Sequence, residues 1–240
     1  MTRRDRLAIL AVAVLVVAVA SAVAGWSTRG ARTGADAPTD LERLGTYGDV
    51  PPFSLVERSG RHVTRDDLRG LVWVVDFIYT ECTESCPTQS LQFARLQSEL
   101  PTAAALRLVS ITVDPAHDTP AVLRAYAERY GATERWWFLT GEKRAIYCLA
   151  TEGFHLAVSD PSAQEPVGCG AARRFGPARA WAGHGSKGLV LMHSARAVLV
   201  DGEGRIRAYH LATDPVSMKR LAANVRRLLA GRGDSSGASR

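Results

Sequence analysis

Several features that would place this chain in a common class of protein are missing. Only four of its 240 residues are cysteine, too few to build a domain of this size on a disulfide scaffold. No stretch interleaves basic and aromatic residues as a nucleic-acid-binding surface does. The net charge of +6 therefore indicates solvation, or weak attraction to acidic partners or anionic lipid. The sequence contains no internal repeat.

Motifs of the commonest enzyme chemistries are missing as well. The chain has no Ser-His-Asp set, no glycine-rich loop that would hold a phosphate and no pair of catalytic carboxylates. These absences argue against hydrolysis and phosphoryl transfer. A thiol–disulfide oxidoreductase activity stays open, because it requires only reactive cysteines.

An uncharged stretch lies close to the N-terminus. Residues 7–25 carry no charge and follow Arg3, Arg4 and Arg6, and 19 residues are about the length needed to cross a bilayer. The alternative is a cleaved signal peptide with an A-x-A site at residues 22–24. We expect a retained, single-pass anchor in a bacterial inner membrane. The basic flank then places the main domain in the periplasm or at the cell exterior, where disulfides form and metals exchange.

Composition divides the chain into four segments. Residues 1–26 are the membrane anchor or signal peptide, and residues 27–48 are a small, polar linker. Residues 49–231 are long enough for one well-buried domain, and nothing indicates a second core. Residues 232–240, rich in Ser and Gly, are expected to be a disordered tail.

The domain is organised around residues 71–87, which read L-V-W-V-V-D-F-I-Y-T-E-C-T-E-S-C-P. The nearly continuous β-branched and aromatic run predicts a strand covered on both faces, as in the parallel sheet of an α/β fold. Pro87 suits the first turn of a helix, which is predicted to continue to Leu100. Cys82 and Cys86 therefore lie at the carboxyl end of a strand, where open α/β sheets place their sites.

The spacing of these two cysteines allows more than one chemistry. If the loop ends in a helical turn, residues four apart share a face, and a Cα separation of about 6 Å permits a disulfide. The same geometry offers two thiolates to one soft metal ion such as Cu(I). Thioredoxin-like reductases use C-x-x-C, so the extra residue here argues against plain thioredoxin activity. A pair of inert buried thiols is the remaining alternative.

The other elements predict a thioredoxin-like order with an inserted N-terminal hairpin. We expect a hairpin at residues 53–63, a second hairpin at 195–209, and strands at 106–113, 136–139 and 154–158. Helices are expected at 120–130, with Thr119 or Asp118 as the N-terminal cap, and at 141–152. A final helix should begin at Pro215, capped by Asp214, and end at Gly231. The first strand of the second hairpin should lie antiparallel beside the central strand. His193, just before that strand, should then approach Cys82 and Cys86.

Residues 159–188 form a long segment without clear periodicity, which contains Cys169 and His184. In an oxidising compartment we expect Cys169 to pair with Cys148 and to tie this segment to the domain. The alternative is a buried Cys148 and an unpaired Cys169. His184 is a possible substitute metal ligand. His62 and His117 are expected at the surface, and no motif supports a ligand role for His155 or His210.

The stretch F-I-Y-T-E-C-T-E-S-C-P at residues 77–87 resembles the copper loop of the Sco/SenC family. Three further stretches strengthen the resemblance and follow in the same order: Asp114 to Pro120, Leu139 to Gly141, and His193-Ser194 before a strand. The resemblance spans residues 50–230. This chain departs from the family at Thr83, because the family usually carries proline directly after the first cysteine.

The resemblance implies a fold, a ligand set and a role. It implies a thioredoxin-like domain that binds copper through Cys82, Cys86 and His193, and two thiolates with one imidazole suit Cu(I) and, with small adjustment, Cu(II). The implied partner is cytochrome c oxidase subunit two, whose dinuclear copper centre is assembled, or another copper acceptor. We therefore expect a membrane-tethered copper metallochaperone. The alternatives are a thiol–disulfide oxidoreductase that reduces that subunit's cysteines, and a copper or redox sensor.

Overall fold

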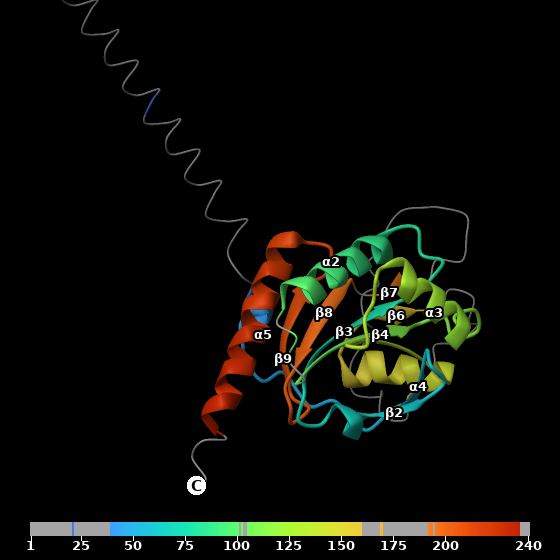
Figure 1. Cartoon of the computed structure of the whole chain (residues 1–240), viewed down its shortest axis with the longest axis horizontal. Helices are drawn as coiled ribbons and strands as arrows, with labels where there is room; N and C mark the ends of the chain where they lie inside the picture. The colour runs from blue at the N-terminus through green and yellow to red at the C-terminus, as the bar shows by residue number, and fades with distance from the viewer. Residues whose placement is uncertain are drawn as a thin grey trace, which may run out of the picture. The chain divides into compact units, whose positions relative to one another are not determined.

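The computed structural model describes residues 39–100, 102, 105–159, 169, 192–193 and 195–235, together with Ser21 (Figure 1). The predicted anchor, apart from Ser21, lies outside these residues, as do most of the predicted linker and residues 236–240. Among the described residues, no helix combines the length and the apolar character that a membrane span requires.

A seven-stranded mixed sheet forms the centre of the domain, in the order β2-β1-β5-β4-β3-β8-β9. Its strands are β1 (Ser54–Glu57), β2 (His62–Thr64), β3 (Val72–Ile78), β4 (Leu106–Thr112), β5 (Trp136–Thr140), β8 (Arg196–Val200) and β9 (Ile206–Leu211). β3, β4 and β5 are parallel, while β1 pairs antiparallel with β5 and β8 pairs antiparallel with β3. The predicted α/β fold with an N-terminal hairpin is confirmed.

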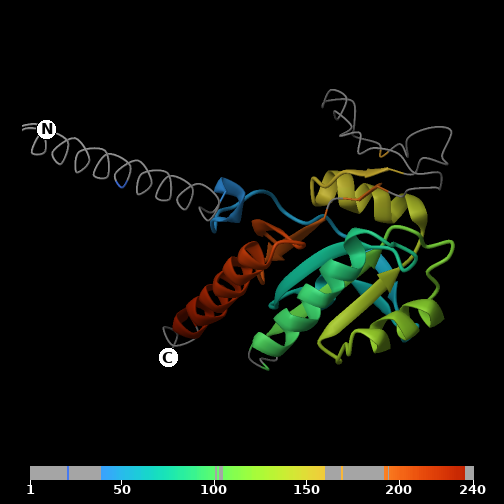
Figure 2. The same cartoon turned by 90° about the horizontal axis from the view of Figure 1, so that it is seen from above.

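Helices cover both faces of this sheet. They are α2 (Ser85–Glu99), α3 (Pro120–Arg129), α4 (Lys143–Cys148) and α5 (Pro215–Ser235), with the short turns η1 (Asp40–Glu42), η2 (Arg65–Leu68) and η3 (Leu149–Gly153). α2, α3 and α5 pack on one face, and α4 with η3 packs on the other (Figure 2). Since successive strand residues point to opposite faces, Val72 and Val74 of β3 face α2, whereas Trp73 and Val75 face α4. β3 is buried along its whole length, as its composition predicts.

Two predicted elements around α4 and η3 differ from the structure. The helix expected over 141–152 begins later, because Glu142 caps it by accepting hydrogen bonds from the N–H groups of Arg144 and Ala145, and its end is a single π-helical turn. The strand expected over 154–158 is only the short β6 (Val158–Ser159), which pairs with β7 (Met192–His193). His155 adopts a left-handed φ of 53°, which ends any extended run before it reaches Val158.

The last helix also runs further than predicted. Asp214 caps it through hydrogen bonds to the N–H groups of Val216 and Ser217, as expected. Gly231 does not end it, since the backbone stays helical to Ser235. A glycine inside a helix costs only about 1 kcal/mol, so the helix can continue through one. The helix therefore includes residues 232–235 of the segment that was expected to be a tail, and residues 236–240 lie outside the described residues.

Candidate metal centre

The two cysteines of the central stretch lie where β3 gives way to α2. β3 ends at Ile78, the loop turns through a hydrogen bond from the Cys82 N–H to the Tyr79 carbonyl at 3.2 Å, and α2 begins at Ser85. The helix starts two residues earlier than predicted, so Cys86 is in its first turn. Both cysteines are buried thiols at the carboxyl edge of the parallel strands.

The Cys82 sulfur lies at the N-terminus of α2. The backbone N–H of Cys86 donates a hydrogen bond to it at 3.4 Å. The first N–H groups of a helix have no partner within the helix and carry partial positive charge, so they favour negative charge on the group they contact. This position therefore favours a thiolate at Cys82, which is the form that binds metals and attacks disulfides.

Cys82 affects the pKa of two neighbouring groups, the thiol of Cys86 and the hydroxyl of Tyr79. A hydrogen bond with Cys82 is the main cause that raises the pKa of Cys86, and burial raises it further. Burial is the main cause of the raised pKa of Tyr79, and interaction with Cys82 adds to it. Cys82, Cys86 and Tyr79 therefore form one cluster of interacting side chains. The sequence reading placed Tyr79 in the strand and missed its contact with the cysteine pair.

A buried carboxyl group lies in the strand that leads to the cysteines. Asp76 of β3 is fully buried and accepts a hydrogen bond from the Ser110 hydroxyl at 2.6 Å, and the Trp136 indole N–H donates to the same hydroxyl at 2.9 Å. The proximity of Asp76 contributes to the raised pKa of Cys86. Sequence reasoning did not single out this residue, although one Asp within an otherwise apolar strand is a visible signal.

A second segment of the predicted site packs against the cysteine loop. Asp118 was expected as one possible cap of α3, but the cap is Thr119, whose hydroxyl accepts a hydrogen bond from the Val122 N–H. Asp118 is instead fully buried and accepts hydrogen bonds from Thr80 and from Thr112. It therefore joins the end of β4 to the start of the loop that carries Cys82.

His117 lies on the solvent side of Asp118. Its Nδ1 lies 3.0 Å from Asp118 Oδ1, and its Nε2 lies 3.3 Å from Oε1 of Glu81, the residue before Cys82. The hydrogen bond with Asp118 is the main cause of a raised pKa at His117. Its side chain is 43% exposed, as expected of a surface residue. The carbonyl of Asp114 accepts a hydrogen bond from the backbone N–H of Asp118.

The structure locates the backbone of His193 and leaves its side chain outside the described part. His193 pairs with Val158 in the β6–β7 ladder, and β8 begins three residues later. β8 runs antiparallel to β3, with Val198 opposite Val75. The chain therefore enters β8 at the edge of the sheet at which β3 ends, as the topology predicts. The ligand role of His193 stays a prediction.

The remaining histidines have other surroundings. His62 and His155 are exposed, and His184 lies outside the described residues. His210 is fully buried in a polar cluster with Ser217, Asn224 and Glu42, far along β9 from its hairpin turn. Within the described residues, no group of three or more His, Cys, Asp or Glu side chains has a geometry that would hold a metal ion.

The predicted disulfide between Cys148 and Cys169 is present. The two Cα atoms are 5.5 Å apart, and the bond joins the end of α4 to a residue 21 positions later in the chain. Cys169 is buried beside Thr151 of η3. The four cysteines therefore separate into one structural disulfide and one pair of thiols.

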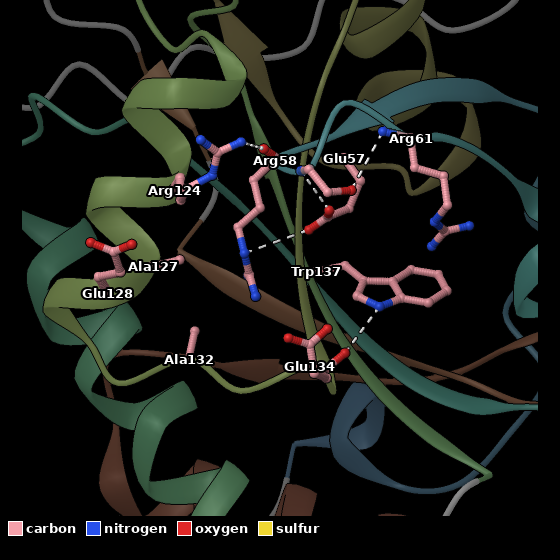
Figure 3. A pocket seen from close by; sticks show the side chains of 10 residues that line it. Glu57, Arg58, Arg61, Arg124, Ala127, Glu128, Ala132, Glu134 and Trp137 are labelled. Carbon is pink, nitrogen blue, oxygen red and sulfur yellow. Dashed lines mark hydrogen bonds and ion pairs between the residues drawn. The ribbon is translucent and has the colours of Figure 1, made fainter.

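A pocket of 410 Å³ lies elsewhere on the domain, between α3, the β1–β2 turn and β5 (Figure 3). Some of its charged groups have partners within the pocket. Arg58 pairs with Glu57, and the guanidinium of Arg61 stacks 4.8 Å from the ring centre of Trp137. The pocket contains neither the cysteine pair nor His193, and it is not the predicted site.

Comparison with known proteins finds a family whose sequence model matches most of this chain. The sequence model of the SCO1/SenC family matches residues 45–230. The SCO1 protein homolog of Bacillus subtilis is 33% identical over 122 residues, which is 50% of this chain and 63% of that protein. The chain thus matches less than two thirds of this relative's length.

Two solved structures share the fold. BsSco, a member of the Sco family of cytochrome c oxidase assembly proteins, superposes with a TM-score of 0.60 at 23% identity, over 77% of this chain and 96% of BsSco. The copper-bound ScoI of Bradyrhizobium japonicum gives a TM-score of 0.57 at 20% identity, over 75% of this chain and 99% of ScoI. At this level of identity the likeness establishes the fold.

Proposed function

The chain belongs to the SCO1/SenC family, and we propose that it is a membrane-tethered copper metallochaperone that assists assembly of the dinuclear copper centre of cytochrome c oxidase. Copper is its cargo, held by Cys82, Cys86 and His193. The proposed acceptor is subunit two of the oxidase or another copper-binding partner. Family relatives support the proposal, since BsSco belongs to the oxidase assembly proteins and the B. japonicum ScoI structure contains copper.

One observation carries the proposal: the sulfur of Cys82, in the loop after β3, accepts a hydrogen bond from the backbone N–H of Cys86 in the first turn of α2, so the two cysteines lie together. Thiolates are the ligands that select Cu(I), and binding a metal displaces their protons. The first turn of α2 offers an N–H group to the sulfur of Cys82, which stabilises that sulfur as an anion. The donor set therefore fits a soft, monovalent metal ion.

His193 is proposed as the third ligand because of where its chain segment runs. It immediately precedes the strand that pairs with β3, and β3 leads directly into the cysteine loop. An imidazole beside two thiolates suits Cu(I) and also tolerates Cu(II). The tether is proposed to be residues 7–25, with the domain on the outer side of a bacterial inner membrane.

Copper stoichiometry of the purified protein tests this function. After reduction, we expect one Cu(I) per chain, held in competition with a chromogenic chelator. Cys82→Ser and Cys86→Ser should each lose this binding. The Cys148→Ser/Cys169→Ser double variant is the matched control, because it removes the same kind of atoms from the other cysteine pair. Copper binding that survives in Cys86→Ser, or that is missing from the wild type, would refute the proposal.

A second candidate function is thiol–disulfide exchange with the oxidase subunit. The hydrogen bond between Cys82 and Cys86 favours it, because two thiols in contact can close a disulfide as they reduce a partner's disulfide. Exchange requires a thiolate and access, whereas copper binding also requires the third ligand. The two functions therefore differ in their dependence on His193.

A further inference from the structure

Asp118 is a fully buried carboxyl group that does not cap the helix it precedes. Its Oδ2 accepts hydrogen bonds from the Thr80 backbone N–H at 3.1 Å and from the Thr112 hydroxyl at 2.5 Å. Its Oδ1 accepts the Thr80 hydroxyl at 2.5 Å and lies 3.0 Å from His117 Nδ1. Burial of a carboxyl group is unfavourable unless hydrogen bonds compensate for lost water, and here both oxygens are engaged.

These contacts join three segments at the edge of the sheet. Thr112 is the last residue of β4, and Thr80 lies two residues beyond the end of β3. The backbone N–H of Asp118 itself donates to the carbonyl of Asp114 at 2.8 Å, which closes the turn between β4 and α3. Asp118 is therefore held by the β4–α3 turn and in turn holds Thr80.

Thr80 is in the turn that places Cys82. The carbonyl of Tyr79 accepts the N–H of Cys82, so the bonds to Asp118 fix the residue in the middle of that turn by both its backbone and its side chain. The sulfur of Cys82 then receives the N–H of Cys86 from α2. Asp118 is thus connected to the cysteine pair through the hydrogen bonds of Thr80, the backbone of the Tyr79–Cys82 turn and the hydrogen bond from the Cys86 N–H to the Cys82 sulfur.

We propose that Asp118 is a positioning residue, which holds the Thr80 turn so that the Cys82 sulfur is presented beside Cys86 with little rearrangement on metal binding. This inference rests on the proposed copper function of the pair. It assigns Asp118 to the site rather than to the cap of α3, a task that Thr119 performs. Groups that orient a ligand from outside the coordination sphere typically affect metal affinity by roughly 10- to 100-fold.

The chain offers a matched set of variants. Asp118→Asn keeps the volume of the side chain but leaves one acceptor oxygen in place of two. Thr80→Val removes the hydroxyl that donates to Asp118, and Thr80→Ser restores it. Thr119→Ala is the control, since it removes the cap one residue away and should cost the helix about 1 kcal/mol without changing the bonds of Asp118.

Two measurements decide the inference, and the first needs no copper. Amide exchange at Thr80, followed by NMR, should be slow in the wild type and in Thr119→Ala and faster in Asp118→Asn. The second is Cu(I) affinity by chelator competition. We expect a loss of about tenfold or more in Asp118→Asn and Thr80→Val, and wild-type affinity in Thr80→Ser and Thr119→Ala.

The possible failures are distinguishable. If the wild type binds no copper, the proposed function fails, and the exchange measurement alone tests whether Asp118 holds the turn. If the wild type binds copper and Thr80→Val binds it as tightly, the positioning role is wrong. If Asp118→Asn does not fold, the Thr80→Val and Thr80→Ser pair still decides the question. A loss of affinity in Thr119→Ala equal to that in Thr80→Val would show that stability, not positioning, controls binding.

Discussion

The backbone N–H of Cys86 donates to the sulfur of Cys82, so the first turn of α2 and the thiol of the preceding loop form one unit. Few side chains are needed to build this arrangement. The buried strand β3 leads into the loop, the first N–H groups of α2 have no partner within the helix, and the two cysteines lie between strand and helix or in the first helical turn.

Cys82 and Cys86 should form a disulfide with each other under mild oxidation. The sulfur of Cys82 already contacts the backbone N–H of Cys86, so closing the bond requires little motion of the loop. Mass spectrometry of the unreduced protein should show a peptide that contains residues 82 and 86 and has lost the mass of two hydrogen atoms. Persistent alkylation of both thiols after oxidation would contradict the contact.

The Cys148–Cys169 disulfide should contribute to stability but not to copper binding. A cross-link that closes a loop of this size stabilises a domain by about 3 kcal/mol, chiefly by restricting the unfolded chain. Urea unfolding of Cys148→Ser/Cys169→Ser should show this loss relative to the wild type. An unchanged free energy of unfolding would mean that the disulfide does little to restrict the unfolded chain.

Acid should destabilise the domain through His210. Burial lowers the pKa of His210 from 6.5 to about 4, although the nearby Glu42 acts in the opposite direction and Arg220 and Arg196 reinforce the shift. The folded state therefore keeps the imidazole neutral where an unfolded chain would protonate it. Its contribution is present above pH 6.5 and is lost as the pH falls towards 4, by up to about 3 kcal/mol.

Denaturant unfolding at several pH values between 6.5 and 4 checks this expectation. His210→Gln removes the titrating group, so its free energy of unfolding should fall less steeply with acid than that of the wild type. His62→Gln, at an exposed histidine, is the matched control and should follow the wild type. Equal slopes in the wild type and His210→Gln would show that other groups dominate.

Much of the fold is readable in the sequence because its signals are local and strong. The uninterrupted apolar run before Cys82 predicts the buried central strand, and Asp214 before Pro215 predicts the start of the last helix. Topology predicts that the residues just before β8, His193 among them, lie near the end of β3, because a hairpin strand antiparallel to β3 begins where β3 ends.

Other features depend on contacts that a local pattern does not contain. Asp118 precedes a helix, as a cap would, and the approach of Thr80, from the loop after β3, makes it a buried acceptor. Gly231 follows the last apolar residues of the pattern, as a glycine that ends a helix would, but the backbone stays helical to Ser235. Histidine adopts a left-handed φ more often than most residues other than glycine, but this preference is too weak to predict the φ of His155 from the sequence.

Copper affinity of His193→Ala tests the central claim most directly. Cys82 and Cys86 serve both the copper and the exchange functions, whereas only copper coordination needs the imidazole itself. His62→Ala is the control for loss of an exposed histidine. Chelator competition measures the affinity, and an assay of oxidase assembly in cells that lack the wild-type protein measures the function.

We expect His193→Ala to keep its fold and both reactive thiols. It should bind Cu(I) more weakly by at least the roughly 10- to 100-fold that loss of an outer-shell partner costs, and it should fail to support oxidase assembly. His62→Ala should match the wild type in both assays. Copper binding by His193→Ala as tight as that of the wild type would contradict the ligand assignment, and full oxidase assembly with it would favour thiol–disulfide exchange instead.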